Sequence, residues 1–159
     1  MPIPTPEQFA SYESTPSQLL AAIESLSEVS MKYRPVEEEW SIHEVIIHLA
    51  DSEAMGFYRL RKTIAEEGST LQVYDEGAWA KNLSYQSQDI PLASTLFAAL
   101  RASSIALLRS LPVETWERTS MHAENGIMSL YDIFIVYLQH GNVHLQQIER
   151  LKQFFSTHA

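Results

Sequence analysis

Apolar residues recur every three or four positions in four separate stretches of the chain, a spacing that is typical of amphipathic helices. The first stretch follows Thr15-Pro-Ser-Gln, in which a hydroxyl, a proline and a glutamine occupy positions that favour a helix start. Leu19, Ile23 and Leu26 then continue the apolar pattern. The sequence therefore predicts a helix from Pro16 to about Tyr33.

Three further stretches carry comparable start and stop signals, including the capping box Ser41-Ile-His-Glu44. No segment shows the sustained alternation of apolar and polar residues that is typical of β-strands. We therefore expect an all-α protein, a four-helix bundle that forms a single domain over residues 1–159. The three further helices are predicted from Ser41 to about Glu67, from Asp89 to Pro112, and from Ser129 to Phe155.

The second and third predicted helices are joined by a long connection, residues 69–88, which lacks helical periodicity. At about 20 residues it is long for a compact domain, so it is either a crossover or a loop that forms a pocket. Asp75 to Ala80 can form one short helical turn within it. Trp79 and Tyr85 are candidates for the mouth of such a pocket, although packing against the bundle is the simpler interpretation of both.

Composition and charge exclude several classes of function. The chain has no cysteine, so disulfides, zinc fingers and iron–sulfur clusters are excluded, and a metal site must use histidine nitrogen and oxygen ligands. The formal net charge of -9 disfavours nucleic acid as a partner. The first residues lack a signal-peptide pattern, and the apolar run Ile133 to Leu138 is far too short for a bilayer. We expect a cytoplasmic protein that does not bind a membrane.

Two histidines lie in the middle of the apolar stripe of the last predicted helix. His140 and His144 share a sector about 80° wide with Tyr137 and Ile148. Residues at i and i+4 are close enough for both imidazoles to bind one ion, as in zinc peptidases. Gly141 stands where those peptidases have a catalytic glutamate, which disfavours peptidase chemistry.

A structural alternative is that both imidazoles are neutral core residues with hydrogen bonds to their neighbours. An imidazole nitrogen buried without a partner costs about 1–3 kcal/mol, and a shared ion would satisfy one nitrogen of each ring. A third ligand would come from another helix, and His48 is the best-placed candidate, although its helical position also allows a surface location. His43 is expected to face solvent, and His122 and His158 to lie in a connection and at the terminus.

Several motifs follow one another along the chain: Trp40-Ser-Ile-His-Glu44, His48-Leu-Ala-Asp-Ser-Glu53, Gly126-Ile-Met-Ser-Leu130, and His140 with His144-Leu-Gln-Gln-Ile148. Their order and spacing resemble the DinB-like superfamily of helical-bundle proteins over most of the chain. This resemblance implies an up-down-down-up four-helix bundle, often dimeric, with a divalent ion held by His48, His140 and His144. The superfamily that the chain resembles includes thiol transferases and isomerases that use low-molecular-weight thiols.

Three histidine ligands would leave a coordination position open, which is typical of catalytic sites. We therefore expect a metal-dependent transferase or hydrolase that acts on a small molecule, with nickel or zinc as the ion and a low-molecular-weight thiol as a possible cosubstrate. The protein is expected to be a homodimer. Glu44, Asp51 and Asp75 are candidate catalytic carboxylates, although capping or solvation explains each of them as well. The alternative is a non-enzymatic, stress-associated dimer that binds a metal or a small ligand.

Overall fold

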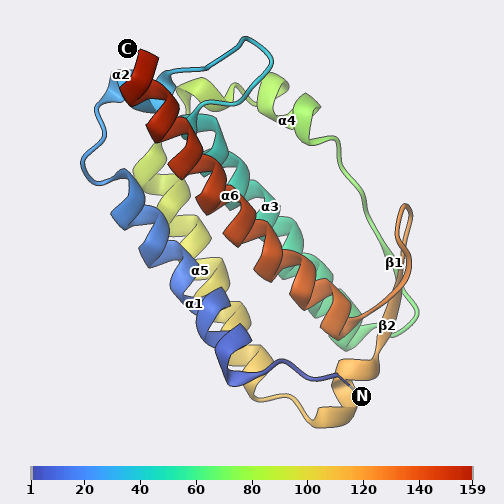
Figure 1. Ribbon diagram of the computed structural model, residues 1–159. Helices are drawn as coiled ribbons and strands as arrows, with labels where there is room; N and C mark the ends of the chain where they lie inside the picture. Colours follow the sequence, from blue (N-terminus) through green and yellow to red (C-terminus); the bar gives the residue numbers. More distant parts are fainter. Residues whose placement is uncertain (1, 159) are drawn as a thin grey trace.

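Four long helices run side by side in the computed structural model, which describes residues 2–158 (Figure 1). In the view of Figure 1, α1 and α6 run upward and α3 and α5 run downward, so the order is up-down-down-up. Both α3 and α1 pack against α5 and α6. The predicted four-helix bundle is confirmed. The long helices are α1 (Pro6–Ile23), α3 (Ile42–Ala65), α5 (Ile90–Arg109) and α6 (Leu130–His158).

The predicted start of the first helix at Pro16 is wrong by about three turns. A capping box formed by Thr5 and Gln8 starts α1, with Pro6 at its first position, and Pro16 lies inside the helix. Proline has no N–H to donate, so the Tyr12 carbonyl four residues earlier loses its helical partner. Nη1 of Arg101 donates to this carbonyl over 2.9 Å, which explains how the helix continues through the proline.

The predicted helix to Tyr33 is also interrupted. The chain leaves α1 after Ile23, and Ser27 then caps a separate short helix, α2 (Glu28–Lys32). The other three predicted helices are confirmed within two or three residues at each end, with Ser41 and Asp89 as the caps of α3 and α5. Local capping signals therefore located these helices accurately, while a proline inside a helix misled the first prediction.

The long connection carries α4 (Glu76–Asn82) and a single 3-10 turn, η1 (Tyr85–Ser87), while a second 3-10 turn, η2 (Val113–Glu117), follows α5. The predicted short helix near Asp75 is confirmed. Figure 1 shows the connection returning along the bundle, from the end of α3 back to the end at which α5 begins. The connection is therefore a crossover, which is one of the two alternatives that the sequence left open for residues 69–88.

The expectation that the chain has no strands is wrong, because three short strands form a small sheet in the order β1-β2-β3. β1 runs parallel to β2, and β2 and β3 form an antiparallel hairpin that turns at Gly126, whose φ is 72°. Strands of two to four residues are too short for alternation to be recognised in the sequence. The strands are β1 (Thr70–Leu71), β2 (Thr119–His122) and β3 (Gly126–Ser129).

The interior of the bundle contains a buried ion pair between two apolar clusters. Nε of Arg101 on α5 lies 2.9 Å from a carboxylate oxygen of Glu53 on α3, and both side chains are 1% exposed. The Tyr12 hydroxyl donates to the same carboxylate. Ion pairs this deep are costly to break, because the partner left behind would be an unpaired buried charge.

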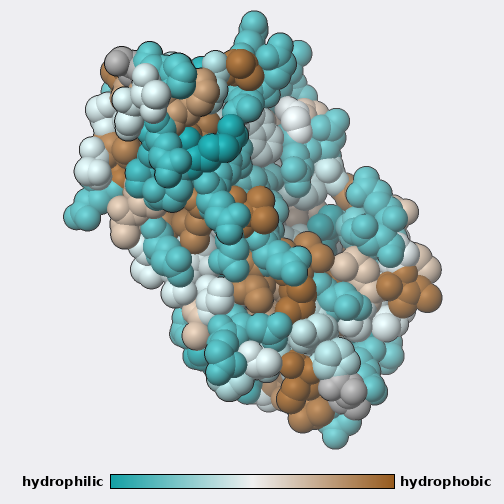
Figure 2. Space-filling model, in the orientation of Figure 1, coloured by the Kyte–Doolittle hydropathy of each residue, from teal (hydrophilic) through white to brown (hydrophobic). Residues whose placement is uncertain are grey.

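The surface is mostly hydrophilic in the view of Figure 2, with separate apolar patches along the bundle. One helix, α5, is long and apolar enough by itself to cross a membrane, with a mean hydropathy of 1.5. Arg101, in the middle of this helix, binds Glu53 and the Tyr12 carbonyl inside the bundle. α5 therefore packs as a bundle helix here, and the absence of membrane binding stays a prediction.

Candidate metal centre

Three imidazoles from two helices converge at one point between α3 and α6. Nε2 of His140 lies 3.0 Å from Nε2 of His48 and 3.1 Å from Nε2 of His144. One ligand nitrogen of each ring lies within 4.8 Å of the others, so the three side chains are close enough to bind a single metal ion. These are the three histidines that the sequence singled out: His140 and His144 on α6, and His48 on α3.

Burial keeps these imidazoles neutral. His48 is fully buried, which resolves its equivocal helical position, while His140 and His144 are half-buried. Desolvation, with a smaller contribution from the neighbouring His144, lowers the pKa of His48 to about 3. Desolvation, with smaller contributions from His144, His48 and Arg101, lowers the pKa of His140 to about 2. Burial also lowers the pKa of His144. Neutral imidazole is the form that binds metal ions.

Two neighbouring side chains fix the orientation of the rings. Nδ1 of His144 lies 2.7 Å from Oε1 of Gln147, so Nδ1 carries the proton and Nε2 presents its lone pair to the cluster. The Trp40 ring lies against His48, with ring centroids 4.7 Å apart. Sequence reasoning overlooked Gln147, although its position three residues after His144 on one helix face was a usable signal.

The glycine between the two histidines of α6 is required by packing. A Cβ at Gly141 would lie 2.8 Å from Nη2 of Arg101 and 3.0 Å from Cγ2 of Thr15. Nη2 of Arg101 also donates to the Tyr137 carbonyl over 2.8 Å. The position that carries the glutamate in zinc peptidases is therefore closed here by the buried guanidinium. This geometry gives a physical reason for the absence of that glutamate.

The three candidate carboxylates make structural contacts, and within residues 2–158 none has a hydrogen bond to the cluster. Glu44 is buried and accepts hydrogen bonds from Arg34 and from the Ser41 backbone. Burial alone would raise its pKa, but these hydrogen bonds outweigh burial and lower the pKa. Asp51 accepts a hydrogen bond of 2.6 Å from the Tyr85 hydroxyl, and Asp75 caps α4 through the Ala78 N–H.

The remaining histidines lie away from the cluster. The expectation that His43 faces solvent is wrong, because it is only 6% exposed and its Nε2 lies 2.9 Å from the Gln88 carbonyl oxygen. The long crossover covers this side of α3, which a helical wheel could not indicate. His122 ends β2 and is buried at the hairpin, and the exposed His158 stacks on Phe154.

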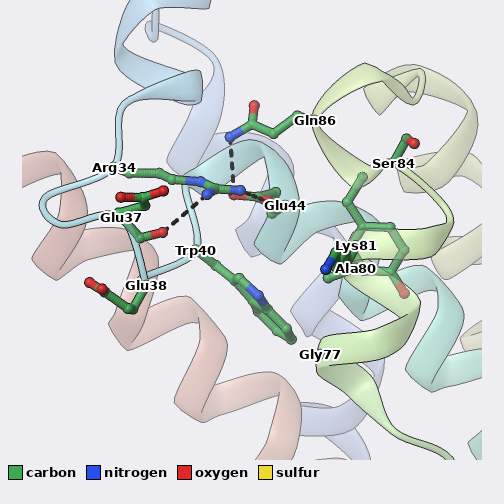
Figure 3. Close-up of a pocket in the computed structure, with 11 residues that line it drawn as sticks. Arg34, Glu37, Glu38, Trp40, Glu44, Gly77, Ala80, Lys81, Ser84 and Gln86 are labelled. Atoms are coloured by element: carbon green, nitrogen blue, oxygen red, sulfur yellow. Dashed lines mark hydrogen bonds and ion pairs between the residues drawn. The ribbon is translucent and has the colours of Figure 1, made fainter.

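A groove of about 500 Å³ lies between the segment before α3 and the segment formed by α4 and η1 (Figure 3). Trp40 points into this groove, and its ring also contacts His48, so one side chain borders both the groove and the imidazole cluster. Trp79 is half-buried, and Tyr85 lines the groove from a fully buried position. Tyr85 is therefore a packing residue whose edge forms part of the wall.

The bundle and its three converging imidazoles define a four-helix protein with a candidate three-histidine metal site. The family model of the DinB superfamily matches residues 11–148. The chain belongs to the DinB superfamily, as the resemblance of its motifs indicated.

Its relatives carry names that refer to metal-dependent chemistry. The chain is 37% identical over 112 residues to a protein of Oceanobacillus iheyensis that is provisionally named a metal-dependent hydrolase, and the match covers 70% of this chain and 64% of that protein. It is 29% identical over 135 residues to a protein of Halalkalibacterium halodurans with the same provisional name, covering 85% and 78%.

Solved structures share the fold. YfiT from Bacillus subtilis, described as a probable metal-dependent hydrolase with an unusual four-helix bundle topology, superposes with a TM-score of 0.89 at 24% identity, over 98% of this chain and 92% of that chain. A mycothiol-dependent maleylpyruvate isomerase superposes with a TM-score of 0.72 at 12% identity, over 92% of this chain and 61% of that chain. At these identities the likeness establishes the bundle.

Proposed function

We propose that this protein is a metal-dependent enzyme of the hydrolase or thiol transferase type, in which His48, His140 and His144 hold a divalent ion. The observation that carries this proposal is the convergence of three Nε2 atoms at one point. Two neutral imidazole nitrogens 3.0 Å apart need a proton or a cation between them, because their lone pairs would otherwise repel each other. A single cation serves all three nitrogens.

The donor set fits a transition metal of borderline softness. Zinc binds histidine nitrogen at about 2.0–2.1 Å, so nitrogens around a tetrahedral ion lie about 3.3 Å apart. The two separations from His140 Nε2, 3.0 and 3.1 Å, are slightly shorter than this value, and all three ligand nitrogens lie within 4.8 Å of one another. Side-chain adjustments would bring them around one ion. Imidazole ligands suit zinc and nickel alike, and we propose one of these two as the resident ion.

Three protein ligands leave a position for an exchangeable group, and a bound divalent ion would supply Lewis acidity and lower the pKa of a nucleophilic water or thiol. The surrounding protein residues would then orient the ligand rings and limit the access of water. Gln147 holds the His144 ring in the tautomer that presents Nε2. Trp40 covers His48 and borders the groove of Figure 3, so it limits access of water from that side.

The names of the relatives favour hydrolysis as the reaction. A thiol cosubstrate is the second candidate, because a mycothiol-dependent isomerase shares the bundle. Both reactions use a nucleophile whose pKa must fall toward neutrality, and the same site could serve either. Glu44 is saturated with donors, whereas Asp51 and Asp75 each accept one hydrogen bond. Asp51 follows His48 by three residues on α3 and is therefore the better candidate base.

The experiment has two stages. Elemental analysis of protein purified under metal-replete conditions should give about one zinc or nickel ion per chain. The loaded protein is then incubated with a panel of esters, amides and electrophiles, with and without glutathione or bacillithiol. Turnover that disappears on chelation and returns with the ion supports the proposal. A stoichiometric ion without any turnover would favour a binding protein, and the absence of an ion would overturn the site.

We further propose that the protein acts on its small-molecule substrate as a homodimer in the cytoplasm. The net charge of -9 supports the exclusion of nucleic acid as a partner. Light scattering coupled to size-exclusion chromatography measures the molar mass in solution. A mass of one chain of 18.1 kDa would refute the dimer without affecting the metal site.

A further inference from the structure

Arg59 is a buried cation without a carboxylate partner. It lies on α3 and is only 9% exposed. Its Nη1 donates to the Tyr137 hydroxyl over 2.9 Å, and its Nε donates to the Gln72 carbonyl over 3.2 Å, so both acceptors are neutral. Within residues 2–158, Arg59 forms no ion pair, whereas Arg101 on α5 is paired with Glu53. Buried charges are normally paired, so an unpaired guanidinium indicates a missing anion.

His122 provides a second donor at the same place. Its Nδ1 accepts the backbone N–H groups of Glu124 and Asn125, over 3.3 and 3.4 Å, so the proton of the neutral ring lies on Nε2. The ring is 6% exposed, and burial and the charge of Arg59 lower its pKa. The hairpin therefore holds His122 as a neutral N–H donor.

Both side chains line a cavity of about 50 Å³ between α3, the hairpin and α6. A volume of about 10–15 Å³ suffices for one water, so this cavity has room for about three waters or one small planar group. Asn125 and the Tyr137 ring also line it. The rest of the wall is apolar and consists of Leu71, Met128, Ile133 and Val136.

The cavity lies next to the imidazole cluster along α6. Tyr137 and His140 are separated by less than one helical turn, and their ring centroids lie 6.5 Å apart. Val136, in the cavity wall, is 43% exposed and lies one turn before His140. The cavity wall at Val136 and the cluster at His140 therefore lie about one turn, or about 5.4 Å, apart along α6. Arg59 contacts the far end of the buried Tyr137 side chain, its hydroxyl, over 2.9 Å.

We propose that Arg59 and His122 form a carboxylate-binding subsite beside the imidazole cluster, which selects small organic acids as substrates. This inference rests on the proposed function for the reacting end only. A single guanidinium, one imidazole N–H and an apolar wall suit a planar monoanion better than a phosphate, which carries more charge and more oxygens. Two carboxylates interact electrostatically with this pair, Glu76 with Arg59 and Glu124 with His122. Neither of them forms an ion pair with Arg59.

The test measures carboxylate binding by isothermal titration calorimetry with acetate and succinate, and with acetamide as the neutral probe. Metal-loaded and chelator-treated protein are compared, so that binding at the ion is separated from binding at the subsite. Arg59→Gln should weaken carboxylate binding by about 10- to 100-fold in both forms, since hydrogen bonds to charged groups are of that strength. Arg61→Gln is the matched control, because Arg61 lies on the same helix and contacts Ser103 and Ser104 instead.

A second variant and a measurement on the unchanged protein keep the inference testable if Arg59→Gln does not fold. His122→Phe keeps the ring shape but removes the N–H donor, and it should weaken acetate binding while leaving ion content unchanged. In the unchanged protein, saturating acetate should shift the His122 Nε2–H resonance. Equal carboxylate affinity in the variants, or an unmoved resonance, would show that Arg59 only fixes the Gln72 carbonyl. If the protein bound no ion but still bound carboxylates, only the proposed metal site would be refuted.

Discussion

The side chains of His48 and His140 bring their Nε2 atoms within 3.0 Å of each other, although 92 positions separate the two residues. This contact joins α3 to α6 through two neutral rings that are held in place by burial. Removing one ring should therefore affect the ion more than the fold, because the apolar clusters on either side remain intact. The first prediction follows from this separation of roles.

His48→Ala should weaken ion binding by more than the roughly 10–100-fold that is typical of removing an outer partner of a metal ligand. The purified variant should therefore contain much less zinc or nickel than the unchanged protein. His158→Ala is the matched control, since His158 is exposed at the end of α6. Elemental analysis gives the ion content, and far-ultraviolet circular dichroism gives the helical content. A His48→Ala protein that retained a full equivalent of ion would refute the ligand assignment.

Gln147→Leu should weaken ion binding by about 10–100-fold without removing a ligand. The reason is that Gln147 fixes the tautomer of His144 through a contact of 2.7 Å. Gln146→Leu is the control, because the neighbouring Gln146 is exposed and lies two positions after His144, on another face of α6. Competition with a chromophoric chelator measures both affinities. Equal affinities in the two variants would show that the Gln147 contact does not orient the ring.

Acid should destabilise the ion-free protein below the ordinary histidine pKa of about 6.5. Burial lowers the pKa of His48 to about 3 and that of His140 to about 2, so between these values and 6.5 the unfolded chain binds more protons than the folded chain. The free energy of unfolding therefore falls as the pH falls, by at most about 1.4 kcal/mol per pH unit for each histidine.

Urea unfolding of chelator-treated protein at pH 7, 6 and 5 measures this dependence, because this range lies above the titration of most carboxylates. His48→Gln and His140→Gln together should flatten the curve. His122 and His144 are unchanged in this variant, and burial lowers the pKa of both, so a weaker slope should remain. A curve that is equally steep in the variant would assign the dependence to groups outside the cluster.

Helical periodicity and caps were sufficient to predict the bundle, because each long helix buries a continuous stripe and three of them begin at a recognisable cap. The start of α1 was missed for a specific reason. Thr15-Pro-Ser-Gln has the same cap signature as the true start, Thr5-Pro-Glu-Gln8, which was overlooked. Only the three-dimensional structure shows that Arg101, 89 positions from Tyr12, donates to the carbonyl that Pro16 leaves without a helical partner. A pairing over that distance leaves no local signal.

The candidate metal centre was predictable to a similar extent. The spacing of His140 and His144 placed both on one face, and the family resemblance supplied His48. Apart from Gln147, which lies on the same helix face as His144, the surroundings were not predictable, because they depend on contacts between elements. The crossover buries His43, and the β2–β3 hairpin carries His122 to the buried Arg59, which no periodicity in the sequence indicates.

The link between Pro16 and Arg101 leads to a prediction about stability. Arg101→Met removes the partner of the buried Glu53 carboxylate and the donor to the Tyr12 carbonyl. Leaving a buried charge unpaired costs about 3–5 kcal/mol, and the unmet carbonyl adds about 1–3 kcal/mol. Urea unfolding should therefore show a large loss in the free energy of unfolding.

Pro16→Ala restores a backbone N–H that can donate to the Tyr12 carbonyl within the helix. In the double variant, the loss caused by Arg101→Met should be smaller by about 1–3 kcal/mol than in the protein that retains the proline, since the Tyr12 carbonyl then has a donor even without the guanidinium. Pro6→Ala is the control, because Pro6 occupies the first position of α1, where no helical hydrogen bond is missing. Strict additivity of Pro16→Ala and Arg101→Met would show that the guanidinium does not replace the donor that the proline removes.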